Sequence, residues 1–437
     1  MRKNIRIGVV CLARKTYDYA AAGALYQKAR EALQAIPDVD WTFIEALVIE
    51  AEDTRAAAAR LSACRLDGMA VITGTFHLGH LALTLKRAVD VPTLLWAFEE
   101  LPYNGGKIRL NSVCGLNLNA SNLYKAGFDD VHCTVGGDID MDWLNAVRMR
   151  AALAQSHIGL LGYRADGFFN LSIDELAAFS KTGILVDHFE ISDVTAQEAN
   201  SASVAGYARI IDAGFDCSGI NARQKQQVAE LCARFRTFME KNALTAAAVR
   251  CWPEFANMYG ISPCAAMSVL QSEGLLLGCE GDLEGVMSMV ICDALGGAPP
   301  FLADLSQVSF EENHALLWHC GVAPINLCAA GCVPSLDTYF AGGRGVTSGF
   351  VLREGRVNTV RIDSARGQTR FFLRSGAAVP MEKLLTGTYG KVVYDQNIRA
   401  LLDDVTSLGV AHHFSLVYGD YERSFKIFAK IMGYKLI

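Results

Sequence analysis

The sequence predicts an α/β protein with two consecutive doubly wound, Rossmann-like domains, followed by a β-rich α+β domain at the C-terminus. Apolar strand-like runs alternate with helical runs and short turns through most of the chain, which is typical of parallel sheets covered by helices. This alternation restarts near His157. After Pro299-Pro300, helices become scarce and short strands with Gly-rich turns replace them. We therefore place three domains at residues 1–155, 156–296 and 297–437.

The first predicted domain begins with Ile5-Arg-Ile-Gly-Val-Val-Cys11, an apolar run followed by a polar loop. Runs of this kind, bounded by polar or Gly-containing turns, indicate buried strands, and the apolar spacing between them indicates helices. The predicted strands are 5–11, 41–48, 68–73 and 91–96, and the predicted helices are 20–36, 51–63 and 80–89.

The second predicted domain repeats the pattern without a residue-level repeat of the first. Its predicted strands are 158–162, 183–189, 244–251 and the apolar run 275–277. Its predicted helices are 172–182, 195–213, 223–241, 262–273 and 283–295.

The third predicted domain is built mainly from short strands. These are 302–308, 315–320, 349–352, 357–362 and 369–373. Helical spacing returns only at 396–408 and 421–432, which gives this region its α+β character.

Composition excludes several classes of protein. The 437 residues are 51% hydrophobic and 20% charged, as in ordinary globular proteins, and the net charge of −6 gives no support to nucleic-acid binding. No apolar run reaches the roughly 18–20 residues of a membrane span. The first residues form a strand rather than a signal peptide. The 13 Cys contain no Cys-x-x-Cys pair, so we expect buried, reduced thiols in a cytoplasmic protein.

The stretch 270–283 carries the first chemical signal. The apolar run Leu275–Leu277 ends in Gly278 and Cys279, and the carboxylate of Glu280 follows at once. Asp282 is a helix N-cap residue type that precedes the next helical run. Because ligands bind at the carboxyl ends of strands in open α/β sheets, we expect Glu280 at a ligand site.

A second carboxylate, Asp304, stands alone in the apolar run Phe301-Leu-Ala-Asp-Leu305. A buried carboxylate is costly unless it is paired, protonated or bound to a cation. An ion pair with an Arg or Lys is the alternative for each acid alone. Both acids lie near the boundary between the second and third predicted domains.

Histidines extend this pair of acids. His412-His413 precedes Phe-Ser-Leu-Val-Tyr418, and His319 ends the run Ala315–Cys320. Two carboxylates with one or two imidazoles form a ligand set for Mn²⁺ or Mg²⁺. A histidine with satisfied hydrogen bonds in the core is the alternative. The residues alone therefore indicate a possible metal site at the seam between two domains.

Three of these segments resemble motifs of the L-fucose/L-arabinose isomerase superfamily. Gly278-Cys-Glu-Gly-Asp-Leu-Glu-Gly285 resembles its Glu-Gly-Asp motif, and Phe301–Leu305 and His412–Tyr418 resemble its other ligand segments. The resemblance implies that Glu280, Asp304 and His413 bind Mn²⁺, or another divalent cation such as Mg²⁺ or Co²⁺. His319 lies where the arabinose-type branch has a further metal-binding histidine.

The resemblance extends over most of the chain. Residues 67–77 and 92–96 are similar to the first domain of that family, and residues 349–361 to its C-terminal β segment. The chain is shorter than typical fucose or arabinose isomerases, which indicates a compact side branch.

The resemblance implies an aldose–ketose isomerase that acts on an open-chain monosaccharide. Glu280 and Asp304 would be the catalytic residues and would move a proton between C1 and C2 through an ene-diol. The sequence leaves a metal-assisted hydride shift open. It also leaves open whether the sugar is a pentose, a 6-deoxyhexose or a 6-substituted hexose.

The family forms oligomers, so we expect a homo-oligomer, with a hexamer favoured, and an active site at a subunit interface. His77 and Trp96 from the first domain of a neighbour would complete that site. Substrate contacts are also predicted for His319, Trp252 and Tyr418, because sugars stack on aromatic rings. Core packing is the alternative for each aromatic residue.

Two other classes of function remain possible from the sequence. One is a non-catalytic sugar-binding protein built from two α/β lobes, although such proteins are usually exported and this chain has a third domain. The other is a nicotinamide-dependent oxidoreductase, which the α/β domains alone suggest. The absence of a well-placed Gly-x-Gly-x-x-Gly argues against the oxidoreductase.

Overall fold

The computed structural model describes residues 2–338 and 345–437, and these residues form two compact units. The N-terminal unit comprises Arg2–Ala151 and Arg423–Tyr434, and the main unit comprises Ala152–Glu422 and Lys435–Ile437. The main unit contains both the second and the third predicted domain, so the predicted boundary near residue 296 stays a prediction.

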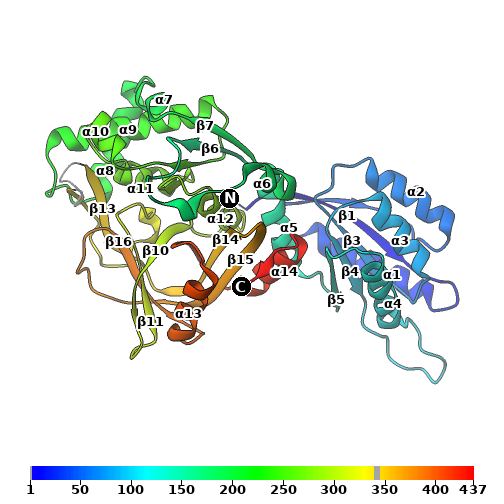
Figure 1. Cartoon of the computed structure of the whole chain (residues 1–437). Coiled ribbons are helices and arrows are strands. Elements are labelled where there is room, and N and C mark those ends of the chain that lie inside the picture. The colour runs from blue at the N-terminus through cyan, green and yellow to red at the C-terminus, as the bar shows by residue number, and fades with distance from the viewer. Residues whose placement is uncertain (1, 339–344) are drawn as a thin grey trace. The chain divides into compact units, whose positions relative to one another are not determined.

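The N-terminal unit is a parallel sheet with helices on its faces (Figure 1). Its strands are β1 (Ile5–Leu12), β2 (Val39–Phe43), β3 (Gly68–Thr73), β4 (Thr93–Ala97) and β5 (Val131–Val135). Its helices are α1 (Tyr19–Gln34), α2 (Ala51–Ser62), α3 (Gly79–Ala88), α4 (Ser112–Lys125), α5 (Met141–Ala154) and α14 (Glu422–Ile431). The strand order β2-β1-β3-β4-β5 confirms the doubly wound prediction.

The last helix belongs to this unit through its contacts with α5. The guanidinium of Arg423 pairs with the carboxylates of Asp140 and Asp142, and Ser424 Oγ donates a hydrogen bond to Asp142 Oδ1 at 2.5 Å. The C-terminal segment therefore returns to a sheet that begins at residue 5, a long-range pairing that local periodicity does not reveal.

The main unit begins with a second parallel sheet of order β7-β6-β8-β9. Its strands are β6 (His157–Leu161), β7 (Leu185–Phe189), β8 (Ala246–Val249) and β9 (Leu276–Cys279). Its helices are α6 (Glu175–Thr182), α7 (Ile191–Thr195), α8 (Ser201–Gly214), α9 (Ala222–Lys241), α10 (Glu254–Met258), α11 (Cys264–Ser272) and α12 (Leu283–Asp293), with a 3₁₀ turn at Phe169–Leu171.

The start of the helix predicted over 195–213 is wrong, because α7 ends at Thr195 and α8 begins only at Ser201. The side chain of Asn200 accepts hydrogen bonds from the backbone N–H groups of Ala202 and Ser203. This N-cap starts a new helix, because it satisfies donors that a continuous helix would bond internally.

The β-rich part of the main unit is a nine-stranded mixed sheet with α13 (Ile398–Leu408) and a 3₁₀ turn at Ile325–Leu327. The strands are β10 (Phe301–Ser309), β11 (His314–His319), β12 (Ser335–Thr338), β13 (Val346–Val351), β14 (Gly355–Ala365), β15 (Gln368–Val379), β16 (Thr388–Tyr394), β17 (His413–Tyr418) and β18 (Lys435–Leu436). Strand β15 also pairs with β16, so β16-β11-β10-β17-β14-β15 close into an antiparallel barrel.

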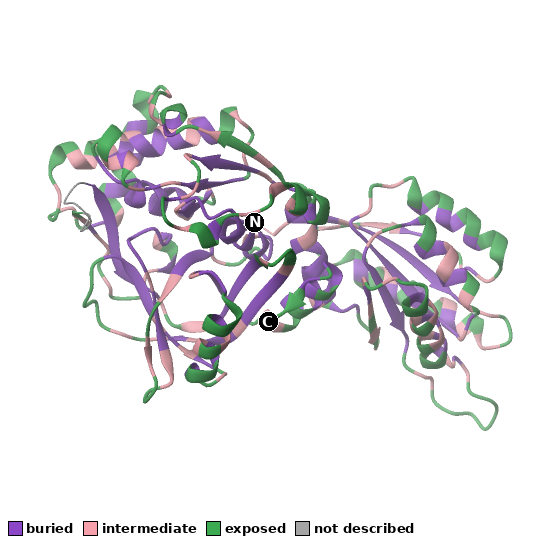
Figure 2. Ribbon diagram, in the orientation of Figure 1, coloured by how far each residue is buried: buried purple, intermediate pink, exposed green. Residues whose placement is uncertain are grey.

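Burial follows this architecture (Figure 2). Strands β8 and β9 are buried along their whole length, and so is β17. Helix α12 is buried at every position from Leu283 to Cys292, so polar side chains next to it lie in a water-poor environment. The main-unit core is therefore continuous from the parallel sheet into the barrel.

All 13 cysteines are free thiols, as predicted, but burial was predicted correctly for only seven of them: Cys114 and Cys133 are exposed, and Cys64, Cys217, Cys328 and Cys332 are half-buried. Within residues 2–338 and 345–437, none of the helices combines the length and the apolar character needed to cross a bilayer.

Candidate active site

Glu280 lies immediately after β9, as the sequence predicts. The strand ends at Cys279, and the Asp282 side chain caps helix α12 by accepting a hydrogen bond from Gly285 N at 2.9 Å. Glu280 has a φ of +62°, in the left-handed region that residues other than glycine rarely adopt. This conformation costs about 1–2 kcal/mol for an L-residue, so the surrounding contacts must hold it.

Two backbone hydrogen bonds hold this turn. Ala165 N donates to Glu280 O at 2.9 Å, and Gly281 N donates to Val249 O at 3.1 Å. A Cβ on Gly281 would lie 2.3 Å from Tyr163 O, so only glycine allows the loop after β6 to approach this closely. The Glu-Gly-Asp sequence thus presents a carboxylate, permits the close approach and starts the helix.

Asp304 and His413 are brought together by the barrel. Strands β10 and β17 are antiparallel neighbours, and Asp304 lies directly opposite His413 in their register. Opposed residues in such a pair have side chains on the same face, so the two groups meet without any help from loops.

The three predicted metal ligands converge on one point. His413 Nε2 lies 3.3 Å from Glu280 Oε2 and 3.4 Å from Asp304 Oδ1. His412 Nε2 lies 3.5 Å from the same Glu280 oxygen. Residues from the parallel sheet and from the barrel therefore share one cluster.

The other ring nitrogen of His413 faces a buried carboxylate. Nδ1 lies 2.9 Å from Asp282 Oδ2, and since a carboxylate only accepts, Nδ1–H donates this bond. Arg361 Nη1 donates to the same Asp282 oxygen at 2.6 Å and to the backbone oxygen of His413 at 3.0 Å. Asp282 and Arg361 together fix both the ring and the backbone of His413.

This arrangement leaves the lone pair of His413 Nε2 directed at two carboxylates, which is unfavourable unless a proton or a metal cation lies between them. Burial lowers the pKa of His413, but the hydrogen bond to Asp282 and the adjacent Glu280 carboxylate outweigh burial and raise it to about 9. Burial raises the pKa of Glu280, but the adjacent rings of His412 and His413 outweigh burial, so this pKa lies well below its usual value.

Several polar atoms of the cluster lack a hydrogen-bond partner within the described chain. They are buried and comprise Glu280 Oε2, Asp304 Oδ1 and His319 Nε2. Buried polar groups are nearly always satisfied in folded proteins, so three such atoms in one place indicate a ligand position. Glu280, His319 and His413 also have ligand atoms within 4.8 Å of one another, and so do Asp304, His412 and His413.

His319 is oriented by its neighbour in the chain. Cys320 N donates a hydrogen bond to His319 Nδ1 at 2.8 Å. A nitrogen that accepts a backbone N–H carries no proton, so the neutral ring has its proton on Nε2. His319 Nε2–H is then a donor without an acceptor at the edge of the cluster.

An aromatic wall borders the carboxylates. Trp252 Nε1 donates a hydrogen bond to Glu280 Oε1 at 3.2 Å, so the indole ring lies beside the carboxylates. The predicted contact of Trp252 with the substrate stays a prediction. Phe168, from the loop after β6, contacts both the Trp252 ring, at 6.3 Å between centroids, and the His412 ring, at 5.3 Å. Asn170 Nδ2 lies 3.2 Å from His412 Nδ1.

Tyr418 does not join this cluster. It lies on β17 at an odd spacing from His413, which places the two side chains on opposite faces of the strand. Its hydroxyl donates to Arg353 O at 2.5 Å, so the polar group is already satisfied. A substrate contact by Tyr418 stays a prediction.

His77 and Trp96 are both buried inside the N-terminal unit. Trp96 Nε1 donates to Gly136 O at 2.9 Å, and His77 Nε2 lies 3.4 Å from Thr73 Oγ1. Burial lowers the pKa of His77 to about 4, so the ring is neutral at physiological pH. These contacts give both residues a packing role, and their predicted contribution to a neighbour's site stays a prediction.

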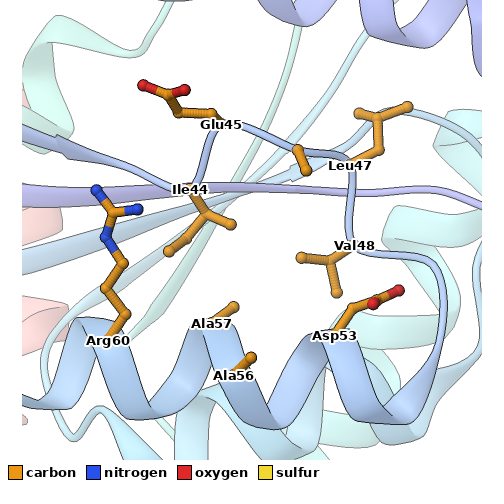
Figure 3. A pocket seen from close by; sticks show the side chains of 9 residues that line it. Ile44, Glu45, Leu47, Val48, Asp53, Ala56, Ala57 and Arg60 are labelled. Carbon is orange, nitrogen blue, oxygen red and sulfur yellow. The ribbon is translucent and has the colours of Figure 1, made fainter.

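The N-terminal unit has a separate cavity of about 390 Å³ that contains none of the predicted site residues. Residues Ile44–Val48, after β2, line it together with Asp53, Ala57 and Arg60 of helix α2, and the side chains of Ile44 and Val48 point toward that helix (Figure 3). The lining is mostly aliphatic with one cation and two carboxylates, and no part of the predicted chemistry falls there.

Sequence reasoning missed four contributors to the cluster. Asp282 was predicted only as a helix cap. The roles of Arg361 and Phe168, and the contact of His412 with Glu280, were not predicted. The apolar context of Arg361 in Val360-Arg-Ile362 is a local signal for a paired buried cation. No local signal identifies Phe168, because its contacts depend on how the loop after β6 folds back.

Comparison with known proteins agrees with the resemblance. Residues 8–138 match a family model described as fucose/sulfoquinovose isomerase, N-terminal domain. The chain is 27% identical over 433 residues to a sulfoquinovose isomerase of Priestia aryabhattai, covering 96% of this chain and 95% of that protein. It is 24% identical to a sulfoquinovose isomerase of Alkalicoccus urumqiensis, covering 98% and 97%.

Among solved structures, a solute-binding protein of an ABC transporter from Burkholderia multivorans has a TM-score of 0.18 and 9% identity, covering 58% of this chain and 82% of that protein. A score this low carries no argument about fold or function. The full-length similarity to sugar isomerases is therefore the informative comparison.

Proposed function

Because the chain belongs to the fucose isomerase-like family of sugar isomerases and is an aldose–ketose isomerase, we propose that Glu280, Asp304 and His413 hold a divalent cation at its active site. Mn²⁺ is the first candidate, with Mg²⁺ and Co²⁺ as alternatives. The observation that carries this proposal is the convergence of His413 Nε2 with the unsatisfied oxygens of Glu280 and Asp304.

The donor set fits such a cation. Two carboxylates and one imidazole are hard or borderline ligands, which favour Mn²⁺ and Mg²⁺ over thiophilic metals. The Asp282 carboxylate behind His413 matches the usual support of a metal-binding histidine, in which the distal N–H is held by a carboxylate. A bound cation would polarise the substrate carbonyl and lower the cost of removing the neighbouring proton.

The residues of the chain perform the proton transfer. Glu280 is the base for the carbon-bound proton of the open-chain sugar, because its carboxylate lies in the cluster 3.3 Å from His413 Nε2. Asp304, on the other side of His413 Nε2, exchanges the hydroxyl proton. Returning the proton at the adjacent carbon completes the conversion through an ene-diol.

His319 and Trp252 position the substrate. His319 Nε2–H donates to a substrate oxygen, which satisfies a donor that has no acceptor in the described protein. Trp252 holds Glu280 through its ring N–H, and its ring, with that of Phe168, offers a surface for the C–H face of a sugar.

The substrate class follows from the relatives. Since curated relatives across the full chain are sulfoquinovose isomerases, we propose an aldohexose with a sulfonate at C6 as substrate. This belongs to the 6-substituted hexoses that the sequence left open. A pentose or a 6-deoxyhexose is the alternative.

A substrate panel tests the proposal. Purified protein is treated with EDTA, reloaded with Mn²⁺, Mg²⁺ or Co²⁺, and incubated with sulfoquinovose, glucose, L-fucose and L-arabinose. We expect ketose from sulfoquinovose, detected by proton NMR, with activity lost in EDTA and restored by Mn²⁺. Unchanged activity in EDTA would refute the metal site. Sugar binding without ketose from any aldose would support the non-catalytic alternative.

Deuterium distinguishes the two chemical routes. In D₂O, transfer through an ene-diol exchanges the migrating proton with solvent, so deuterium enters the ketose at C1. A hydride shift leaves the product unlabelled at that carbon. We expect incorporation of deuterium.

We also propose that the protein is a homo-oligomer, with a hexamer favoured, because the family resemblance implies a site completed by a neighbouring subunit. Light scattering on the purified protein measures the mass directly. A monomer that retains full activity would refute this assembly requirement.

A further inference from the structure

Four cysteine thiols meet directly behind His319. Cys251, Cys264, Cys279 and Cys320 are all buried in the main unit. Cys264 Sγ lies 3.7 Å from Cys320 Sγ, and the Cys279 thiol is hydrogen-bonded to the thiols of Cys251 and Cys320. The four sulfurs therefore form one continuous chain of contacts.

These thiols come from four separate segments. Cys251 follows β8, Cys264 begins α11, Cys279 ends β9 and Cys320 follows β11. Because no two of them are close in sequence, the chain contains no Cys-x-x-Cys spacing and the sequence gives no metal signal. Only the folded main unit assembles them.

One pair of these sulfurs already has the spacing of a thiophilic cation site. In a tetrahedral zinc thiolate, bonds of about 2.3 Å place the sulfurs about 3.8 Å apart. The Cys264–Cys320 separation of 3.7 Å is already at this value. Cys279, Cys320 and His319 also have ligand atoms within 4.8 Å of one another.

We propose that these four cysteines form a second metal site, selective for soft d¹⁰ cations of the Zn²⁺ class and distinct from the Glu280–Asp304–His413 site. Cys279 and Cys320 are its central ligands, and Cys251 and Cys264 complete the sulfur set. Each thiol that binds releases one proton, so a divalent cation and four thiols give a tetrathiolate and four protons. Thiolates select soft cations and carboxylates select hard ones, so the two sites discriminate by ligand chemistry.

The two sites share a border. Cys279 directly precedes Glu280, and Cys320 N–H holds His319 Nδ1 at 2.8 Å. A cation that draws Cys279 and Cys320 together shifts the end of β9 and the ring of His319. Soft cations should therefore inhibit the isomerase without displacing Mn²⁺. This consequence rests on the proposed function, whereas cation binding itself does not.

Cadmium is the probe. Reduced, full-length protein saturated with Mn²⁺ is titrated with Cd²⁺ in the absence of oxygen, while the ultraviolet cadmium–thiolate charge-transfer band and isomerase activity are recorded. We expect the band to saturate at one equivalent and activity to fall with it. Cadmium-113 NMR of the wild-type protein then reports sulfur coordination without any substitution.

Matched variants identify the ligands. Cys264→Ser removes a thiol that contacts Cys320 but is not itself part of the proposed isomerase site, so Cd²⁺ affinity should fall at least about tenfold while basal activity is retained. Cys133→Ser, at an exposed thiol, should leave the titration unchanged. Absence of the band, or its loss in Cys133→Ser but not in Cys264→Ser, would overturn the proposal.

The Glu280→Gln variant separates the two claims. It lacks the proposed hard site but retains all four thiols, so the cadmium band should persist. If the protein has no isomerase activity at all, the band remains a valid test of the thiol site. If the band appears without inhibition, binding holds and the coupling through His319 is refuted.

Discussion

At the carboxyl edges of the two parallel sheets, buried polar side chains have opposite hydrogen-bonding states. In the N-terminal unit, Trp96 Nε1 donates to Gly136 O, and His77 lies within 3.4 Å of Thr73 Oγ1 and Leu78 O. In the main unit, oxygens of Glu280 and Asp304 have no hydrogen-bond partner in the described chain. The edge with Trp96 and His77 is thus the more nearly satisfied one, with Asn119 Oδ1 beside His77 as an exception. Glu280 and, on the adjoining barrel strand β10, Asp304 each keep one oxygen without a partner among the described residues.

The difference shows that strand ends alone do not locate a site. A buried polar group with a hydrogen-bond partner stabilises the fold. A buried polar group without one costs folding free energy, which other interactions must offset, and it is available to a ligand. The left-handed backbone conformation of Glu280 adds strain at the same unsatisfied cluster of the main unit. Substitutions of Glu280 or Asp304 should therefore reduce activity more than stability, and substitutions of Trp96 or His77 should do the reverse.

Glu280→Gln should have the largest effect. It removes a metal ligand and the base together, so kcat should fall at least about 10³-fold, a far larger effect than the loss of stability from its contacts with Trp252 and His413. Steady-state kinetics and calorimetry measure the two quantities. Glu273→Gln is the control, since Tyr207 and Arg236 satisfy that carboxylate. Equal loss of activity in both variants would contradict the assignment.

Asp282→Asn should have the next largest effect. It weakens the support of His413 Nδ1, so affinity for Mn²⁺ should fall about 10–100-fold. Stability should also fall, because Arg361 loses its carboxylate partner in a buried ion pair. Mn²⁺ affinity is read by electron paramagnetic resonance, independently of activity.

Asp363→Asn is the matched control for this variant. Asp363 also pairs with Arg361 but makes no contact with His413. It should lower stability comparably and leave Mn²⁺ affinity within a few-fold of wild type. A matching loss of affinity in Asp363→Asn would show that Asp282 acts only through general stability.

Asp282 also shows how far the sequence could predict this molecule. Its cap of α12, most of the alternation of β1 to β9 with helices, and the proposed ligand trio follow from local pattern or motif, whereas α4, β5 and α5 were not predicted. Its contact with His413 joins residues 131 positions apart and depends on β17 lying next to β10 in the barrel. Closure of that barrel through β15 and β16 is a non-local pairing that strand periodicity cannot specify.

Trp96→Phe tests the satisfied edge. The ring N–H bond to Gly136 O is lost and a small cavity forms, so unfolding free energy should fall by about 1–3 kcal/mol. The kcat and KM should remain unchanged if Trp96 only packs. Chemical denaturation and kinetics on one preparation give both values. A raised KM with unchanged stability would instead establish the substrate contact that the sequence predicts. It would also refute the view that Trp96 serves only the fold.

Glu284→Gln should have the smallest effect and a sign that depends on pH. Glu284 is buried on α12, and burial raises the pKa of its carboxyl to about 7. Arg361, 3.7 Å away, and Ser364 favour the charged form, while Asp363 and Asp282 oppose it, and burial outweighs the favourable contacts. At neutral pH the charges of Asp282 and Asp363 already balance those of Arg361 and Arg370.

The sign follows from proton binding. Between pH 4.5 and about 7 the folded state holds a proton on Glu284 that the unfolded state releases, so stability falls as pH rises through this window. A glutamine side chain does not titrate, so the variant lacks this loss of stability. The variant should match wild type near pH 4.5 and be the more stable of the two at pH 8. Denaturation at both pH values measures the difference, and a variant less stable at pH 8 would show that Arg361 keeps Glu284 ionised and that this carboxylate is a satisfied group.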